Sequence, residues 1–176
     1  NGAGFASIGY DATGSGRAVV AYHKLDDNRT KLARGDGLGL STFSVFNFPA
    51  AGVNCQNVVS GAGSVDGPYF WPKIAVDVNG SNQPIAHVVS TEYSGAQVNL
   101  SLVYYKTNAG MTAPSATCGL WIDSTTTVSA VIQQDPNSNK VAIVWLRSAD
   151  GAHADAIQQR NNDVVFTEST DLGTSW

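Results

Sequence analysis

The chain has 176 residues, of which 43% are hydrophobic and only 14% are charged, and its formal net charge is −4. The hydrophobic content is sufficient for a packed core, while charged residues fall well below the roughly 25% of an average domain. Because the ten basic residues are scattered, the sequence excludes a basic stripe for nucleic acid, and it contains no apolar run of about 18 residues that would predict a membrane span.

Gly, Ser, Thr and Asn take the place of the missing charged residues, which is typical of an exported β-protein with many turns. We therefore expect a secreted or cell-surface location. The first residues, NGAGFASIGYD, contain neither an initiator Met nor an apolar signal segment. This start predicts a processed or excised section of a longer chain.

Three stretches share one pattern, in which a short apolar strand, a polar turn and a more apolar strand follow one another. They are residues 6–24, 72–90 and 129–147, and their turns read DATGSG, DVNGSN and DPNSN. Gly, Asn and Asp tolerate the backbone conformations of tight turns, so each stretch is predicted to be a β-hairpin. The second strands are almost continuously apolar, which favours sheets that are covered on both faces.

A third strand is expected after each hairpin, at residues 29–34, 98–106 and 163–169. Taking Ile8, Ile74 and Ala130 as equivalent gives repeats of 66 and 56 residues, longer than the roughly 40 to 50 residues of standard propeller blades, so long loops must interrupt the units.

The repeated units predict an all-β fold. We expect a partial β-propeller of about three antiparallel blades, at about residues 5–50, 70–113 and 127–176, forming part of a propeller of six to eight blades. A two-sheet sandwich is the rival architecture, since it also has short strands at regular intervals.

The last eight residues, STDLGTSW, resemble the Asp box of bacterial-neuraminidase-type (sialidase-like) repeats, written S/T-x-D-x-G-x-x-W. Its four defining positions are occupied by Ser169, Asp171, Gly173 and Trp176. A carboxylate can accept hydrogen bonds from the backbone of the turn, glycine supplies a left-handed conformation, and the aromatic ring covers the hairpin. In that family the box joins the third and fourth strands of a blade, so the resemblance implies a further strand after Trp176.

Weaker copies of the box are expected in the two earlier units. In KTNAGMTA, Asn108 stands for the aspartate and Gly110 for the glycine, while Ala113 replaces the tryptophan. The segment RGDGLGLSTF keeps Asp36, Gly39 and an aromatic residue, Phe43, with altered spacing.

Sialidases of this superfamily use three convergent arginines, a Tyr–Glu pair and an acidic residue. None of the five arginines lies in the Arg-Ile-Pro motif of those enzymes, and Glu92 and Tyr93 are adjacent on an expected strand, where side chains point to opposite faces. Glu168 directly precedes the box. No catalytic set is therefore predicted within this segment.

Three further features remain open at the level of sequence. The aromatics Tyr69, Phe70 and Trp71 either face a ligand or fill the space between blades. Cys55 and Cys118 either form one disulfide or remain separate thiols. No cofactor or metal is expected, because the three histidines lack metal-ligand spacing, although a loop calcium ion is left open.

The resemblance implies an exported sialidase-like propeller module for recognition or structure at the cell surface, with a carbohydrate or protein ligand on one face and the remaining blades of a longer chain as neighbours. The alternative is part of an exported glycoside hydrolase whose catalytic residues lie largely outside this segment.

Overall fold

The structure is a computed structural model that describes residues 3–11, 16–24, 29–36, 42–48, 70–78, 82–94, 99–116, 119–123, 127–148 and 162–176. All its regular elements in these ranges are β-strands, as the composition predicts. The eleven strands are β1 (Ala3–Tyr10), β2 (Ala18–Lys24), β3 (Arg29–Gly35), β4 (Phe43–Asn47), β5 (Phe70–Val78), β6 (Pro84–Ser94), β7 (Asn99–Lys106), β8 (Leu120–Asp123), β9 (Thr127–Gln134), β10 (Val141–Ser148) and β11 (Asn162–Ser169).

The strands form three antiparallel sheets, each made of consecutive strands. The first sheet has the order β1-β2-β3-β4, the middle sheet β5-β6-β7-β8, and the third sheet β9-β10-β11. The three predicted hairpins and the three predicted third strands are therefore confirmed. The middle sheet differs from its expected unit, because β8 extends it beyond residue 113 to Asp123.

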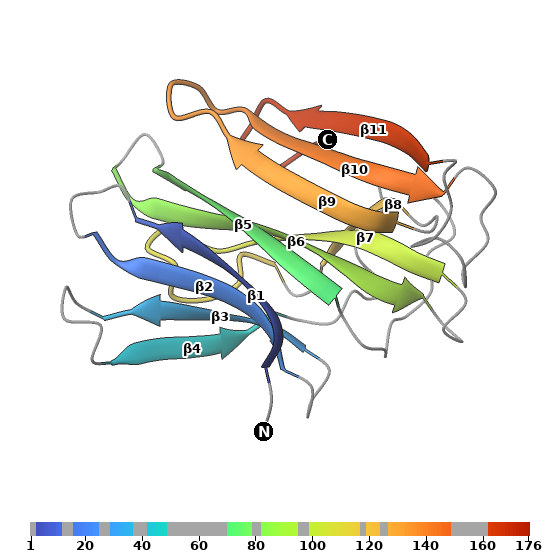
Figure 1. The fold of residues 1–176 in the computed structure, drawn as a ribbon. Coiled ribbons are helices and arrows are strands. Elements are labelled where there is room, and N and C mark those ends of the chain that lie inside the picture. The colour runs from blue at the N-terminus through green and yellow to red at the C-terminus, as the bar shows by residue number, and fades with distance from the viewer. Residues whose placement is uncertain are drawn as a thin grey trace.

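The three sheets are stacked, with their first strands β1, β5 and β9 side by side (Figure 1). At Gly9 of β1, an added Cβ would lie 2.8 Å from a methyl group of Val76 and 3.5 Å from one of Ile74, both on β5. Glycine therefore permits this close approach of two strands. Three stacked sheets with adjacent first strands differ from the two facing layers of a sandwich.

Side chains alternate between the two faces of the middle sheet, and both faces are buried. Ala86, Val88, Val103, Tyr105 and Trp121 pack in one hydrophobic cluster with residues of the first sheet. The other face meets the third sheet in a second cluster that contains Val89, Leu102, Tyr104, Ile122, Ile132, Ile143 and Trp145. The expectation of burial on both faces is confirmed for this sheet, and it explains the apolar runs at residues 85–89 of β6, interrupted only by His87, and at residues 102–105 of β7.

The strand pairings show which residues of the three sheets are equivalent. Ile8 pairs with Val20, Ile74 with Val88, and Ile132 with Ile143. Three positions after each isoleucine stands an aspartate at the end of the first strand: Asp11 and Asp135 directly follow β1 and β9, and Asp77 is the last residue but one of β5. The expected equivalence of Ala130 was therefore wrong by two residues, and Ile132 takes its place.

The stack has two ends. We call one end the corner end. There β1, β5 and β9 finish, and there β3, β7 and β11 finish as well. At the opposite end, called the loop end, β1, β5 and β9 begin and β2, β6 and β10 finish. The sequence candidates that the structure describes fall at one end or the other.

Candidate functional site

The segment Ser169–Trp176 forms a tight corner that is organised by the Asp171 carboxylate. Asp171 Oδ1 accepts hydrogen bonds from the backbone N–H groups of Thr174 (3.0 Å) and Ser175 (2.8 Å), and Asp171 Oδ2 accepts one from the Ser175 hydroxyl (2.6 Å). The Ser169 hydroxyl accepts the Gly173 N–H at 2.8 Å. The carboxylate and the hydroxyl therefore hold backbone donors that a turn would otherwise leave unpaired.

Two consecutive residues of this corner, Leu172 and Gly173, have left-handed backbones, with φ of 55° and 72°. Gly173 is buried against the side chain of Tyr104, and a Cβ added to it would lie 1.9 Å from the Tyr104 hydroxyl oxygen. Glycine is therefore required here for both its conformation and its size.

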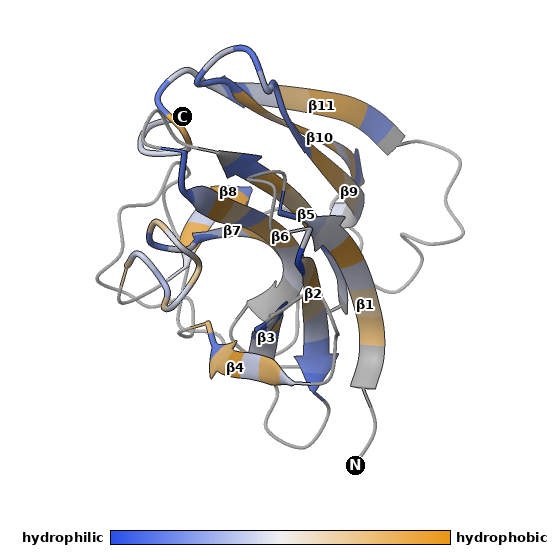
Figure 2. Cartoon of the chain, turned by 90° about the vertical axis from the view of Figure 1, so that its left-hand side faces the viewer, coloured by the Kyte–Doolittle hydropathy of each residue, from blue (hydrophilic) through white to orange (hydrophobic). Residues whose placement is uncertain are grey.

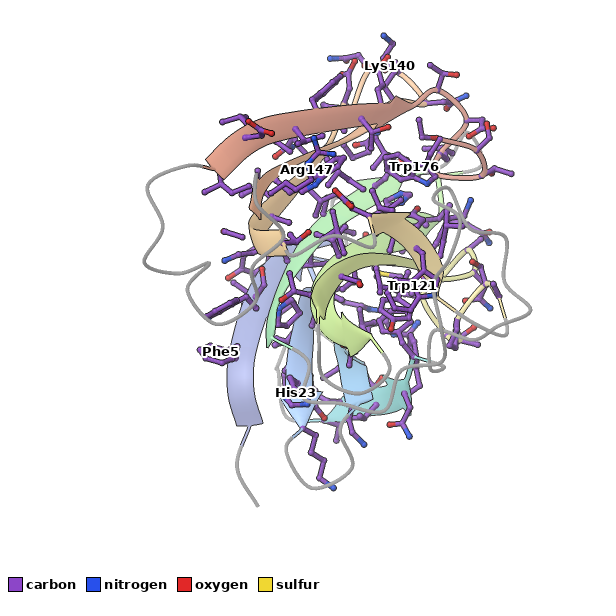
Figure 3. All side chains as sticks on the ribbon, turned by 90° about the vertical axis from the view of Figure 1, so that its right-hand side faces the viewer. Phe5, His23, Trp121, Lys140, Arg147 and Trp176 are labelled. Carbon is purple, nitrogen blue, oxygen red and sulfur yellow. The ribbon has the colours of Figure 1, made fainter. Side chains whose placement is uncertain are left out.

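The corner is docked on the middle sheet through an aromatic contact and a cation. The ring of Trp176 meets that of Tyr104 edge to face, with centroids 4.9 Å apart, and Figure 3 shows Trp176 beneath the corner. The half-buried Lys106 donates from Nζ to the Leu172 carbonyl (2.8 Å) and to Thr174 Oγ1 (3.2 Å). Tyr104 in turn contacts the buried His87, whose Nδ1 lies 2.7 Å from the tyrosine hydroxyl.

These contacts shift the pKa values of the groups involved. The Ser175 hydroxyl and amide and the Ser169 hydroxyl hold the pKa of Asp171 well below its usual value. Burial lowers the pKa of His87 from 6.5 to about 3, with a smaller contribution from the charge of Lys106. Burial raises the pKa of Tyr104 and lowers that of Lys106. His87 is thus a neutral, hydrogen-bonded core histidine, as its apolar strand predicts.

The turn after β7 has the same backbone form as the terminal corner. Its two left-handed residues are Gly110 (φ 83°) and Met111 (φ 52°). The Gly110 N–H bonds to the Pro84 carbonyl, as the Leu172 N–H bonds to the Asn139 carbonyl. Gly110 therefore corresponds to Leu172, and Met111, not Gly110, occupies the place of Gly173.

Asn108 supplies the acceptor of this second corner from an unexpected position. By register Thr107 matches Ser169, since Thr107 is bonded to Ala86 and Ser169 pairs with Val141. Ala109 then occupies the aspartate position and Pro114, not Ala113, the tryptophan position. Asn108 Oδ1, one residue early, accepts the N–H groups of Thr112 (2.9 Å) and Ala113 (3.0 Å). These are the equivalents of the two amides that Asp171 holds.

This correspondence can be tested by moving the acceptor along the chain. We expect Asn108→Ala to lower the free energy of unfolding by about 1 kcal/mol, because two amides lose their side-chain acceptor. Adding Ala109→Asp to that variant should recover most of the loss, since a carboxylate at the register position of Asp171 can reach the same amides. Urea unfolding measures both changes, and no recovery in the double variant would contradict the correspondence.

The segment after β3 keeps an aspartate at the corner end, with different contacts. Asp36 accepts a hydrogen bond from the Ser44 hydroxyl at 2.7 Å, and its N–H bonds to the Thr42 carbonyl. Phe43 begins β4 and is 43% exposed, whereas Gly39 lies outside the described residues.

Cations link each sheet to the corner of the next. Arg34 donates to the Gly110 carbonyl of the middle sheet, as Lys106 donates to the Leu172 carbonyl of the third. Arg34, Lys106 and Glu168 are register equivalents, and Glu168 instead accepts from Lys140 at 3.0 Å. At the loop end, a guanidinium nitrogen of Arg147 lies 3.7 Å from an oxygen of the Asp163 carboxylate. Arg34 and Arg147 therefore lie at opposite ends of the stack.

An aromatic pair lies at the loop end. Phe5 and Trp71 occupy equivalent positions in β1 and β5, each within an irregularity of the strand pairing. Their ring centroids are 5.4 Å apart, and Phe5 is 40% exposed. Trp71 has φ of 50°, which is an outlier for a bulky residue. Figure 3 shows Phe5 projecting outward from β1.

The sheets also bury many polar side chains toward the loop end. The hydroxyls of Thr30 and Ser90, from the first two sheets, lie 3.4 Å apart, and the Trp145 indole donates to Asp123 Oδ2 at 2.8 Å. The set of buried polar residues in the loop-end half of the described strands is His23, Thr30, Lys31, Ser90, Thr91, Ser101, Asp123 and Thr127.

Several sequence candidates fall outside what the structure describes. Tyr69, Cys55 and Cys118 lie outside the described residues, as do the side chains of Phe70, Glu92 and Tyr93. Within the described ranges, no group of three or more His, Cys, Asp or Glu side chains is placed to hold a metal ion. The same ranges contain no helix that could cross a membrane.

Comparison with known proteins found no similar protein from which a function could be inferred. The chain matches no family model, no curated protein and no solved structure.

Proposed function

We propose that this chain forms consecutive blades of a sialidase-like β-propeller, and that the propeller is an exported recognition module that binds carbohydrate at its loop end. Three observations support the propeller: the meander order within each sheet, the adjacent first strands, and the equivalent residues that recur in all three sheets. The two corners after β7 and β11, with paired left-handed residues and a side-chain acceptor, support the Asp-box type of repeat.

The aromatic pair at the loop end carries the binding proposal. Exposed aromatic rings offer a flat apolar surface on which the C–H face of a sugar ring can stack. Trp71 is held in an unfavourable backbone conformation, and such outliers gather at ligand sites. Phe5 and Trp71 come from the first strands of two neighbouring sheets, so in the proposed propeller they would lie near the central axis, at the loop end.

Binding can be tested with a microarray of sialylated and neutral oligosaccharides, followed by titration calorimetry with the glycan that gives the highest signal. We expect Trp71→Ala and Phe5→Ala each to weaken binding about tenfold or more, since anchor aromatics dominate such contacts. Phe43→Ala is the matched control, because Phe43 is an aromatic residue of similar exposure at the corner end, and it should leave the affinity unchanged.

Two results would contradict the proposal. One is an array on which no glycan binds, or on which Trp71→Ala binds as well as the unmodified chain. The other is hydrolysis of a fluorogenic sialoside by the purified chain, which would place a catalytic set within this segment.

A further inference from the structure

The third sheet has an apolar outer face, which we call the third-sheet face. It comprises Val131, Val144, Val164 and Phe166. Val144 pairs with Val131 on one side and with Phe166 on the other, so these three side chains form a row across the sheet. Val131 is 55% exposed, Val164 is 72% exposed and Phe166 is 59% exposed. Figure 2 shows the hydrophobic colour along β11 at the edge of the stack.

The residues of this face are the equivalents of buried residues in the middle sheet. Val89 pairs with Tyr104 in the middle sheet as Val144 pairs with Phe166 in the third. Val89 and Tyr104 are only 0% and 3% exposed, because the third sheet covers them. The third-sheet face therefore has the pattern of a surface that another sheet covers.

The first sheet presents the complementary surface, which we call the first-sheet face and which comprises Ile8, Tyr10, Val20 and Val45. Ile8 is 56% exposed, Tyr10 is 63% exposed and Val45 is 52% exposed. The equivalents of Ile8 in the later sheets are Ile74 and Ile132, which face the preceding sheet and pack on it. Figure 2 shows the hydrophobic colour on β1 and β4 as well.

We propose that the third-sheet face of one copy of this chain binds the first-sheet face of a second copy. The contact would repeat the packing of the first sheet on the middle sheet and of the middle sheet on the third, with Ile8 of the second copy in the role of Ile74 and Ile132. A second copy is the occupant that the structure favours, because this chain carries both halves of an interface that it already forms twice internally. Such a head-to-tail interface is heterologous, and two copies of three sheets give a ring of six if the rotation closes.

One position of the third-sheet face departs from the internal contacts. Gln133 stands where the first and middle sheets have Gly9 and Ala75. Its longer side chain keeps the first strands of the two copies further apart at this point, which makes the contact between copies looser than the internal ones.

Sedimentation velocity of the 176-residue chain over a range of concentrations tests this interface. The unmodified chain is expected to associate into dimers or larger species. Phe166→Glu and Ile8→Glu should each raise the dissociation constant at least about tenfold, because either change puts a charge into an apolar contact. An equimolar mixture of the two variants should form a dimer, since each keeps one intact face.

Only a head-to-tail contact predicts that the mixture associates when each variant alone does not.

Asn137→Glu, in the exposed β9–β10 turn, is the control variant and should associate like the unmodified chain. Near-ultraviolet circular dichroism checks that every variant is folded. The proposal is overturned if the unmodified chain stays monomeric at all concentrations, if Ile8→Glu still associates by itself, or if the mixture does not. These outcomes are independent of glycan binding, which is proposed for a different surface, the loop end.

Discussion

Gly173→Ala is expected to lower the free energy of unfolding by about 2 to 5 kcal/mol. A left-handed residue with a side chain costs about 1 to 2 kcal/mol, and Gly173 has φ of 72°. The new Cβ would also lie 1.9 Å from the Tyr104 hydroxyl oxygen, and overpacking of a buried contact costs about 1 to 3 kcal/mol more. Either Tyr104 or the corner must move, which weakens the packing of Trp176. Urea unfolding followed by tryptophan fluorescence measures the loss.

Gly110→Ala is the matched control that separates conformation from contact. Gly110 has φ of 83° in the equivalent turn, but nothing lies within 4 Å of its added Cβ, so this variant should lose only about 1 to 2 kcal/mol. Tyr104→Phe removes the nearest atom to Gly173 and should recover part of the loss in the Gly173→Ala background, which a double-mutant cycle detects. Equal losses in the two glycine variants would show that contact with Tyr104 is unimportant.

The elements predicted from the sequence were those specified by local signals. Each hairpin has its own turn that begins with Asp and contains Asn, Gly or both, between two apolar strands, and the second strand of each hairpin is apolar enough to need cover on both faces. Four of the five residues of strand β4, FSVFN, are exposed, and β8 has only four residues. Neither gives a comparable signal, so the fourth strands were not predicted.

The residue-by-residue correspondence between the corner after β7 and the corner after β11 could not be predicted from the sequence. Asn108 looks like the aspartate of an Asp box because glycine follows two positions later, yet the strand register places Ala109 there. An asparagine one residue early can hold the same amides, since the side-chain oxygen needs only to reach the centre of the turn. The partners of the terminal corner, Tyr104 and Lys106, are more than 60 residues away in sequence, and no local pattern joins them to it.

The aromatic pair at the loop end combines one expected residue with one that sequence reasoning missed. Trp71 stood out within the cluster GPYFWP, whereas Phe5 is a single aromatic near the start of the chain. The signal that could have found Phe5 is its position three residues before Ile8, which matches the position of Trp71 before Ile74. That signal becomes visible only once the first strands are aligned by their pairing.

Acid is expected to destabilise the fold through His87, starting at a pH well above that at which the carboxylates titrate. The pKa of His87 falls from 6.5 to about 3 on folding, because the ring is buried and Lys106 lies nearby. Below pH 6.5 His87 is therefore protonated in the unfolded chain, whereas in the folded chain it stays neutral down to about pH 3. The contribution of His87 to the free energy of unfolding is fully present above pH 6.5. It decreases by about 1.4 kcal/mol for each pH unit below 6.5, which is a loss of about 3 kcal/mol at pH 4.5.

His87→Gln isolates this contribution, because glutamine can still hydrogen-bond to the Tyr104 hydroxyl but does not titrate. The free energy of unfolding of the variant, measured by urea at pH 7.0, 5.5 and 4.5, should fall less steeply than that of the unmodified chain by about 1.4 kcal/mol per unit below pH 6.5. Asp171 does not affect this comparison, since its lowered pKa removes stability only below pH 3.8 and acts equally in both proteins. Parallel pH profiles would mean that His87 takes up its proton in the folded state, and with it that the contact between β6 and β7 opens to water beneath the corner.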